Sequence, residues 1–144
     1  APRMLYHIWP SPLSLAGATI ALLCRAPLVR RDHTLEACGG LLPRLLPRIG
    51  LGMRPVAITL GHVILAVDQA TLDAWRTHER VHVAQAERWG PLFPIAYAMA
   101  SAVAKAKGRD PYRENVFERE AFSAAEPALS VAKGQSAGRV NGER

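Results

Sequence analysis

The stretch Thr77-His78-Glu79-Arg80-Val81-His82-Val83-Ala84-Gln85 contains two histidines four residues apart, with a glutamate directly after the first. On an α-helix, side chains four residues apart lie on the same face, one above the other. The two imidazoles can therefore bind one metal ion, and zinc accepts neutral imidazole nitrogens at about 2.0–2.1 Å. We predict that His78 and His82 are zinc ligands and that Glu79 is the general base that deprotonates a zinc-bound water.

The residues around this motif predict a long helix from about residue 69 to residue 89. Asp68 or Thr71 is a suitable N-cap, and Trp89-Gly90-Pro91 is a strong stop signal. Three-and-four spacing predicts one buried face, made of Trp75, His78, His82, Gln85 and Trp89. Both histidines then point inward, where an unpaired imidazole would cost free energy. The alternative is an ordinary amphipathic helix with hydrogen-bonded histidines, since HExxH also occurs by chance.

Length and composition predict a single domain, because 144 residues with 49% hydrophobic side chains can build one modest core. We expect this domain to cover residues 1–126, followed by a flexible basic tail over 127–144. The net charge of +6 suits an anionic membrane surface or a nucleic acid, but no basic motif interleaved with aromatic residues favours nucleic acid. Cys24 and Cys38 are two free thiols or one bridge.

Two apolar segments, residues 13–24 and 91–104, raise the question of membrane contact. Each is shorter than the roughly 20 residues that a membrane-spanning helix needs. The first is interpreted as a buried helix, a membrane-inserted or interfacial segment, or a cleaved leader. The second is apolar nearly all round, which favours a core helix, with an interfacial helix as the alternative. A cytoplasmic or membrane-associated location is favoured over secretion.

The remaining segments before the motif predict strands, so the expected fold class is α+β. Residues 28–37 indicate a weak hairpin or strand pair that ends at Gly39-Gly40, and residues 54–67 indicate two strands that meet near Gly61, or one long bent strand. Residues 41–48 repeat Leu-Leu-Pro-Arg, which excludes a long helix and favours a segment on a membrane or an irregular surface loop. A strand just before the metal helix can pair with an extended peptide substrate.

The third zinc ligand is expected on a last helix, over residues 116–126. Glu118 and Glu120 lie about 200° apart around such a helix, so only one of them can face the metal. Glu118 shares its side with the apolar residues Ala121, Phe122 and Ala125, and we therefore predict that it is the ligand. The alternative is that both glutamates are solvated on a surface helix.

With both halves of the site located, residues 57–121 resemble the gluzincin group of HExxH metallopeptidases, and more narrowly small bacterial proteins of similar layout. The matching stretches are Thr59 to Leu65, His78 to Pro91 and Arg109 to Ala121. The resemblance implies a zincin-like fold, with a small sheet packed on the metal helix, and supports Glu118 as the ligand that begins Glu118-Arg119-Glu120-Ala121. Gluzincins often have an aspartate after that alanine, which orients a ligand histidine, and Phe122 stands there. Asp110, Glu120 or a backbone carbonyl would have to take this role.

The leading functional hypothesis is a small zinc-dependent hydrolase, most plausibly a peptidase acting on a peptide or protein substrate. His62, Tyr112 and Arg113 are the candidates for binding substrate or stabilising the oxyanion. The alternative is a catalytically silent accessory or scaffold subunit that keeps a zincin fold and associates with a membrane or a membrane protein complex.

Overall fold

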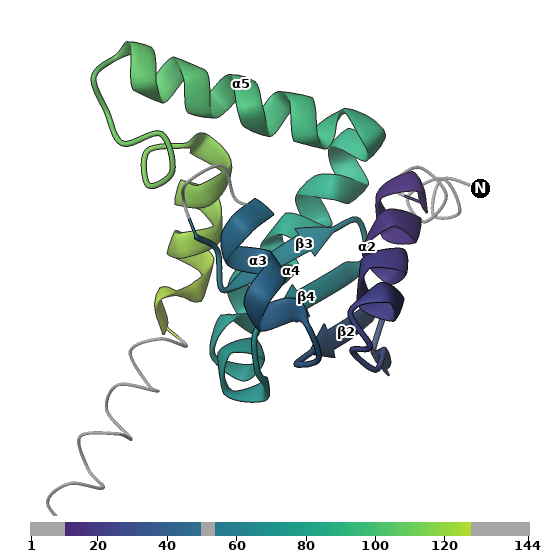
Figure 1. The fold of residues 1–144 in the computed structure, drawn as a ribbon. Coiled ribbons are helices and arrows are strands. Elements are labelled where there is room, and N and C mark those ends of the chain that lie inside the picture. The colour runs from purple at the N-terminus through teal and green to yellow at the C-terminus, as the bar shows by residue number, and fades with distance from the viewer. Residues whose placement is uncertain (1–10, 50–53, 128–144) are drawn as a thin grey trace, which may run out of the picture.

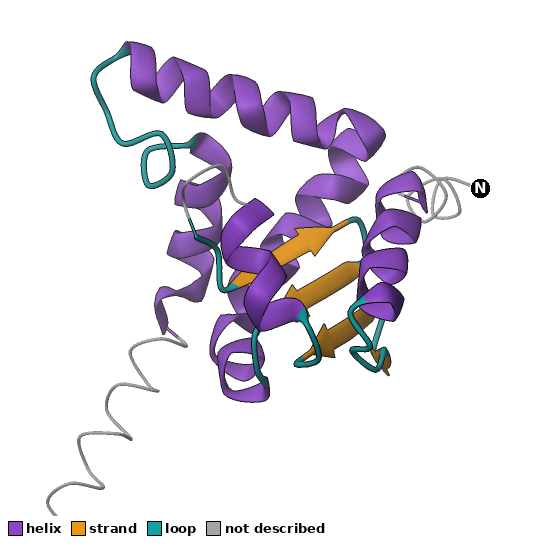
Figure 2. Ribbon diagram, in the orientation of Figure 1, coloured by secondary structure: helices purple, strands orange, loops and turns teal. Residues whose placement is uncertain are grey.

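The computed structural model describes residues 11–49 and 54–127 of the chain; of the predicted tail over 127–144, residue 127 is helical and residues 128–144 lie outside the described residues. The helices are α2 (Ser11–Leu23), α3 (Leu42–Ile49), α4 (Gln69–Trp89), α5 (Phe93–Ala106) and a C-terminal helix over 116–127, with a 3-10 turn η1 (Gly90–Leu92) between α4 and α5. The strands are β1 (Val29–Arg31), β2 (Thr34–Cys38), β3 (Ala57–Leu60) and β4 (Val63–Ala66) (Figures 1 and 2). The predicted α+β class is confirmed.

The four strands form one mixed sheet in the order β1-β2-β4-β3. Each outer strand pairs antiparallel with its sequence neighbour, as in Leu60↔Val63, whereas the two central strands run parallel. The structure therefore has the predicted strand pair in residues 28–37 and two strands that meet at Gly61 rather than one bent strand; Gly61 turns the second pair with a φ of 61°, which glycine adopts without steric cost. This hairpin places β3 at one edge of the sheet, next to α4.

The sheet is the middle of three layers. Alternate residues point to opposite faces of a strand, so Val63 and Leu65 pack with Ala21, Leu42 and Leu46 of α2 and α3. Their neighbours in β4, Ile64 and Ala66, pack with Leu72 and Val83 of α4 on the other face. Figure 1 shows this arrangement, with α2 and α3 on one side of the sheet and α4 on the other.

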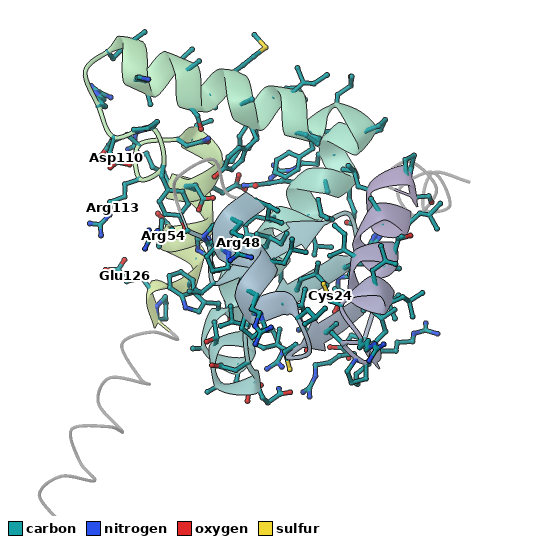
Figure 3. The ribbon with its side chains drawn as sticks, viewed as in Figure 1. Cys24, Arg48, Arg54, Asp110, Arg113 and Glu126 are labelled. Atoms are coloured by element: carbon teal, nitrogen blue, oxygen red, sulfur yellow. The ribbon has the colours of Figure 1, made fainter. Side chains whose placement is uncertain are left out.

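The Leu-Leu-Pro-Arg segment forms the short helix α3, so the expectation of an irregular surface loop is wrong, whereas the expected absence of a long helix holds. Pro43 lies in the first turn of α3, where backbone N–H groups have no acceptor within the helix, so the missing amide hydrogen of proline costs no hydrogen bond. Pro47 lies inside the helix, where it cannot donate to the carbonyl oxygen of Pro43, so α3 forms at the cost of one backbone hydrogen bond. Leu42 and Leu46 are buried in the core, and Arg48 is exposed (Figure 3).

The two apolar segments form α2 and α5, and each has only one buried side. The buried residues are Gly17 and Ala21 on α2, and Phe93 and Ala104 on α5. In the described residues, no helix combines the length and hydropathy needed to cross a bilayer. Cys24 and Cys38 are free thiols.

Helix α2 packs closely on the sheet at Gly17, because a Cβ added there would lie 2.8 Å from Cβ of Val63. We expect Gly17→Ala to lower the free energy of unfolding by about 1–3 kcal/mol, since overpacking outweighs the gain of roughly 0.5–1 kcal/mol in helix propensity. Thr19→Ala, at an exposed position of the same helix, is the control and should change it by less than about 0.5 kcal/mol. Denaturant unfolding measures both, and a stabilised Gly17→Ala protein would contradict this close packing.

Candidate metal site

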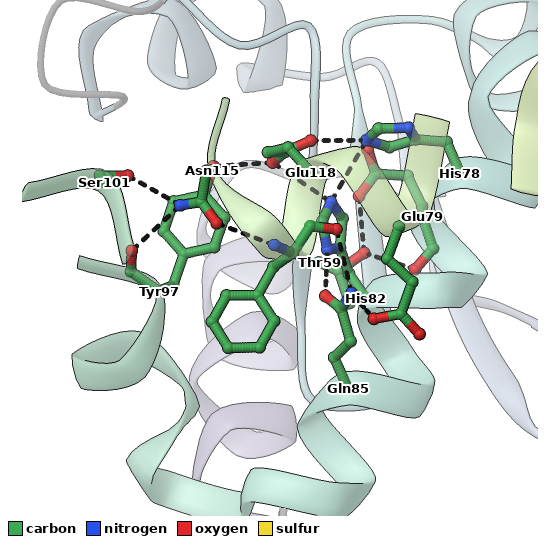
Figure 4. Close-up of polar contacts among 11 residues, drawn as sticks. Thr59, His78, Glu79, His82, Gln85, Tyr97, Ser101, Asn115 and Glu118 are labelled. Atoms are coloured by element: carbon green, nitrogen blue, oxygen red, sulfur yellow. Dashed lines mark hydrogen bonds and ion pairs between the residues drawn. The ribbon is translucent and has the colours of Figure 1, made fainter. Parts of the chain in front are cut away.

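Three side chains from two helices converge at one point in the interior. His78 and His82 project from α4, as the four-residue spacing predicts, and Glu118 projects from the C-terminal helix (Figure 4). The Nε2 atoms of the two histidines are 3.2 Å apart. Oε2 of Glu118 lies 3.0 Å from His78 Nε2, and Oε1 lies 3.3 Å from His82 Nε2.

These distances fit a single bound ion. Ligands at about 2.0–2.1 Å in a tetrahedral zinc site are about 3.3–3.4 Å from each other, close to the observed separations. Oε2 of Glu118 is buried and has no hydrogen bond within the described residues, although it faces an imidazole nitrogen. Two imidazoles and a carboxylate are also a donor set that zinc accepts. The three side chains can therefore hold a metal ion, as the sequence predicts.

Gln85 fixes the tautomer of His82. Its amide nitrogen donates to the carbonyl oxygen of Phe117 at 3.0 Å and to Oε2 of Glu120 at 2.9 Å. Both partners are acceptors, so the amide orientation is determined and Oε1 of Gln85 must face Nδ1 of His82, at 2.8 Å. When the ring is neutral, His82 Nδ1 therefore carries the proton, and Nε2 presents its lone pair to the site. This is the tautomer that a metal ion requires.

Glu79 lies on α4 between the sheet and the histidines, where its carboxyl group is buried. Thr59 of the edge strand β3 donates its hydroxyl hydrogen to Oε2 of Glu79 at 2.7 Å. Burial raises the pKa of Glu79, against the opposing effects of the His82 charge and the Thr59 hydrogen bond. A carboxyl group with a raised pKa is suited to accept and return a proton near neutral pH.

Helix α5 contributes Tyr97, whose hydroxyl donates to Oε1 of Glu118 at 2.7 Å. Asn115 holds this contact in place: its side-chain amide donates to the Tyr97 carbonyl and to Ser101 Oγ, and its Oδ1 accepts from the Phe117 amide. Asn115 is thus the N-cap of the C-terminal helix. One residue therefore connects α5 to the helix that carries the third ligand.

Electrostatic effects in the cluster favour a charged Glu118. Burial raises the pKa of its carboxyl group, but the adjacent His78 and His82 and the Tyr97 hydroxyl outweigh this effect and lower it to about 2. Burial likewise lowers the pKa of His82, but the hydrogen bond to Glu118 and the charge of Glu79 raise it overall. Burial and the Glu118 charge raise the pKa of Tyr97 and Tyr112, so both remain hydroxyl donors.

Aromatic side chains surround these polar groups. Trp75 and Phe122 contact the ring of His78 edge-on, and Phe93 and Tyr97 lie next to the ring of His82. Phe122, at the position where gluzincins often have an aspartate, therefore packs on a ligand ring rather than orienting it by a hydrogen bond. Trp89, expected on the buried face, is 45% exposed.

Of the other predicted residues, Tyr112 and Glu120 lie near the site, whereas His62, Asp110 and Arg113 do not take part in it. Tyr112 is half-buried beside Glu118, and Glu120 reaches His82 only through Gln85. His62 instead contacts Ser14 and Glu87, with its Nε2 2.9 Å from Glu87 Oε1. Asp110 does not orient a histidine, because its carboxylate accepts from the backbone amides of residues 112 and 113. The side chain of Arg113 points outward (Figure 3).

Sequence reasoning did not assign roles to Thr59, Gln85 and Tyr97. Tyr97 is one of only two residues with a hydroxyl group in an otherwise apolar helix, and Gln85 is a polar residue on the predicted buried face. A polar residue at a position expected to be buried was therefore the available signal. Thr59 had no such signal, because a threonine in a strand is ordinary.

Comparison with known proteins gave no relative: no protein-family model, curated protein or solved structure matches the chain. The functional argument therefore depends on the site itself.

Replacing Gln85 by leucine is expected to weaken zinc binding about 10- to 100-fold, because His82 loses the acceptor that fixes its tautomer. Competition with a chromogenic chelator measures the affinity. Gln69→Ala, which removes an exposed glutamine at the start of the same helix, is the matched control and should bind zinc as wild type does. Unchanged affinity in Gln85→Leu would show that His82 is not oriented in this way.

Proposed function

We propose that this protein is a small zinc-dependent hydrolase of the zincin-like type, acting on amide bonds of a peptide or protein. The observation that carries the proposal is the convergence of His78 Nε2, His82 Nε2 and the Glu118 carboxylate, with His82 held in the tautomer that can bind metal. A zinc ion held there would act as a Lewis acid toward a carbonyl group and toward water. The edge position of β3 beside α4 agrees with a zincin-like arrangement.

The residues around the ligands have separable roles in this proposal. Glu79 takes a proton from the attacking water and returns it to the leaving amine. Thr59 holds the carboxylate of Glu79 by a hydrogen bond and leaves its other oxygen for that proton. Tyr97 and Tyr112 both interact with Glu118, so either hydroxyl would have to leave that carboxylate to donate a hydrogen bond to a developing oxyanion.

The burial of the site supports the second candidate, a zincin-like scaffold without catalysis. His78, Glu79, His82 and Glu118 are all buried, and the hydroxyl groups of Tyr97 and Tyr112 face the carboxylate of Glu118. A peptide must reach these groups for hydrolysis, so the enzyme requires displacement of covering side chains. The scaffold requires none, and it can bind metal in the same way. Metal content and hydrolysis therefore have to be measured separately.

The first test is the metal content of the purified protein. We expect about one zinc ion per chain in the wild type by elemental analysis, and loss of that zinc in Glu118→Ala, because two imidazoles alone hold the ion weakly. Glu126→Ala, an exposed glutamate on the same helix, is the matched control and should retain zinc. A wild-type protein that stays free of metal after zinc is supplied would exclude both the hydrolase and the metal-binding scaffold.

The second test separates the two candidates. In the hydrolase, Glu79→Gln keeps the zinc but lowers the turnover of a fluorogenic peptide library by about 100-fold or more, because it removes the proton acceptor. Glu87→Gln is the matched control, since Glu87 is on the same helix but contacts His62 instead. Equal turnover in Glu79→Gln would exclude Glu79 as the base. If the wild type and both variants bind zinc but none of them hydrolyses the peptides, the scaffold is favoured.

A further inference from the structure

Helix α5 has an apolar face that no described element covers. Its inner side carries Phe93, Tyr97 and Ala104 toward the rest of the protein, whereas its outer side carries large apolar residues that remain more than half exposed: Leu92 (in the preceding turn), Ile95, Met99 and Val103. Figure 1 shows α5 along one border of the molecule, with no described element beyond it. We call these four residues, together with the exposed Ala98 and Ala102, the outer face of α5.

A continuous apolar face of this kind is unusual on an isolated protein in water. Single exposed leucines are ordinary, but neighbouring ones that follow one side of a helix mark an interaction surface. The residues of the outer face recur at three- and four-residue intervals, so they form one stripe along the helix. No charged residue interrupts it, because the first one after Arg88 is Lys105.

Basic residues stand at the C-terminal end of the stripe. Lys105, Lys107 and Arg109 are exposed, and none of them forms an ion pair with another described residue. No acidic residue occurs anywhere from Arg88 to Arg109. The surface therefore combines an apolar stripe with three basic residues, next to a single acidic one, the exposed Asp110, which is the pattern of a helix that lies in the interface of an anionic membrane.

A second copy of the chain fits this face less well. A stable dimer buries about 20–30 residues on each side, and the outer face of α5 has only six. The basic residues at its end would also repel their counterparts in a parallel pairing of the two helices. A bilayer needs no matching surface, and its anionic headgroups attract each basic residue within roughly 10 Å at 0.1 M ionic strength.

We propose that the outer face of α5 binds the surface of an anionic bilayer, with the helix parallel to the membrane plane and Lys105, Lys107 and Arg109 at the headgroups. The apolar side chains enter the boundary between headgroups and acyl chains, and the helix does not cross the bilayer. None of the metal-site residues lies on this face. The proposal is thus independent of the proposed hydrolase activity.

The test is sedimentation of the full-length protein with vesicles of phosphatidylcholine alone and of phosphatidylcholine and phosphatidylserine at about 7:3. Binding is expected only with the anionic vesicles, and Ile95→Gln/Met99→Gln should lower the partition coefficient by at least about tenfold. Leu22→Gln/Leu23→Gln is the matched control, because these leucines are 68% and 75% exposed on α2, comparable to Ile95 (59%) and Met99 (64%). That control should bind as wild type does.

The charge contribution is tested in the same way. Lys105→Gln/Lys107→Gln should weaken binding by about tenfold or more, because each basic residue at an anionic surface contributes roughly a factor of five. Arg44→Gln/Arg48→Gln, which removes the same charge from the exposed side of α3, should have a smaller effect. Circular dichroism and thermal unfolding show that each variant remains folded.

Three results would overturn the proposal. The wild type could fail to sediment with anionic vesicles, or the α2 control could lose binding as much as the α5 variant does. Light scattering without lipid could also reveal a dimer that Ile95→Gln/Met99→Gln dissociates, which would identify a second copy as the occupant of this face.

Discussion

The burial of three potential metal ligands in an apolar interior is the constraint on which the rest of the structure depends. A buried imidazole or carboxylate without a polar partner costs several kcal/mol, as an order of magnitude. His78, His82 and Glu118 meet this requirement partly through one another, at separations of 3.0–3.3 Å. Gln85 and Tyr97 provide the further hydrogen bonds, and each belongs to a network that reaches another helix. The same contacts therefore stabilise the fold and define the site.

The sheet determines where α4 can lie. Apolar side chains of β4 fix one face of the helix, and a buried ion pair fixes its position along the sheet: Arg76 donates two hydrogen bonds to Glu36 of β2. The carboxylate of Glu36 is 3% exposed, so loss of Arg76 would leave this buried charge with only its longer contact to Arg31, at 3.4 Å. With α4 fixed in this way, Glu79 lies against Thr59 of the edge strand, and the histidines point away from the sheet toward the C-terminal helix.

Helix α5 has different roles on its two sides. Tyr97 on the inner side contacts the ligand Glu118, and Asn115 joins the backbone of α5 to the start of the C-terminal helix. The outer side carries Ile95 and Met99 in an exposed position. A helix that is apolar all round can thus contribute to a polar site on one side and offer an interaction surface on the other.

Local sequence signals indicated the long helix α4, the last helix, the strands and the three candidate metal ligands. The four-residue spacing of His78 and His82 fixes their common face because it reflects the pitch of the helix. Asp68, Gly61 and Gly90 mark boundaries because capping and positive φ depend on a few neighbouring atoms. The apolar stripe of the last helix also favoured Glu118 over Glu120, and the structure brings Glu118 to the histidines.

Tertiary packing decided what depends on residues distant in sequence. The parallel pairing of β2 with β4, the contact of Thr59 with Glu79 and the position of Tyr97 join segments separated by about 20 or more residues, and no local pattern encodes them. Asp110 and His62 were plausible from sequence, but a backbone turn and a contact with Glu87 occupy them. The Leu-Leu-Pro-Arg segment became a helix because the core beneath Leu42 and Leu46 outweighs the low helix propensity of its prolines. Propensity and periodicity are properties of a short stretch of chain, whereas burial and hydrogen-bond partners are properties of the whole fold.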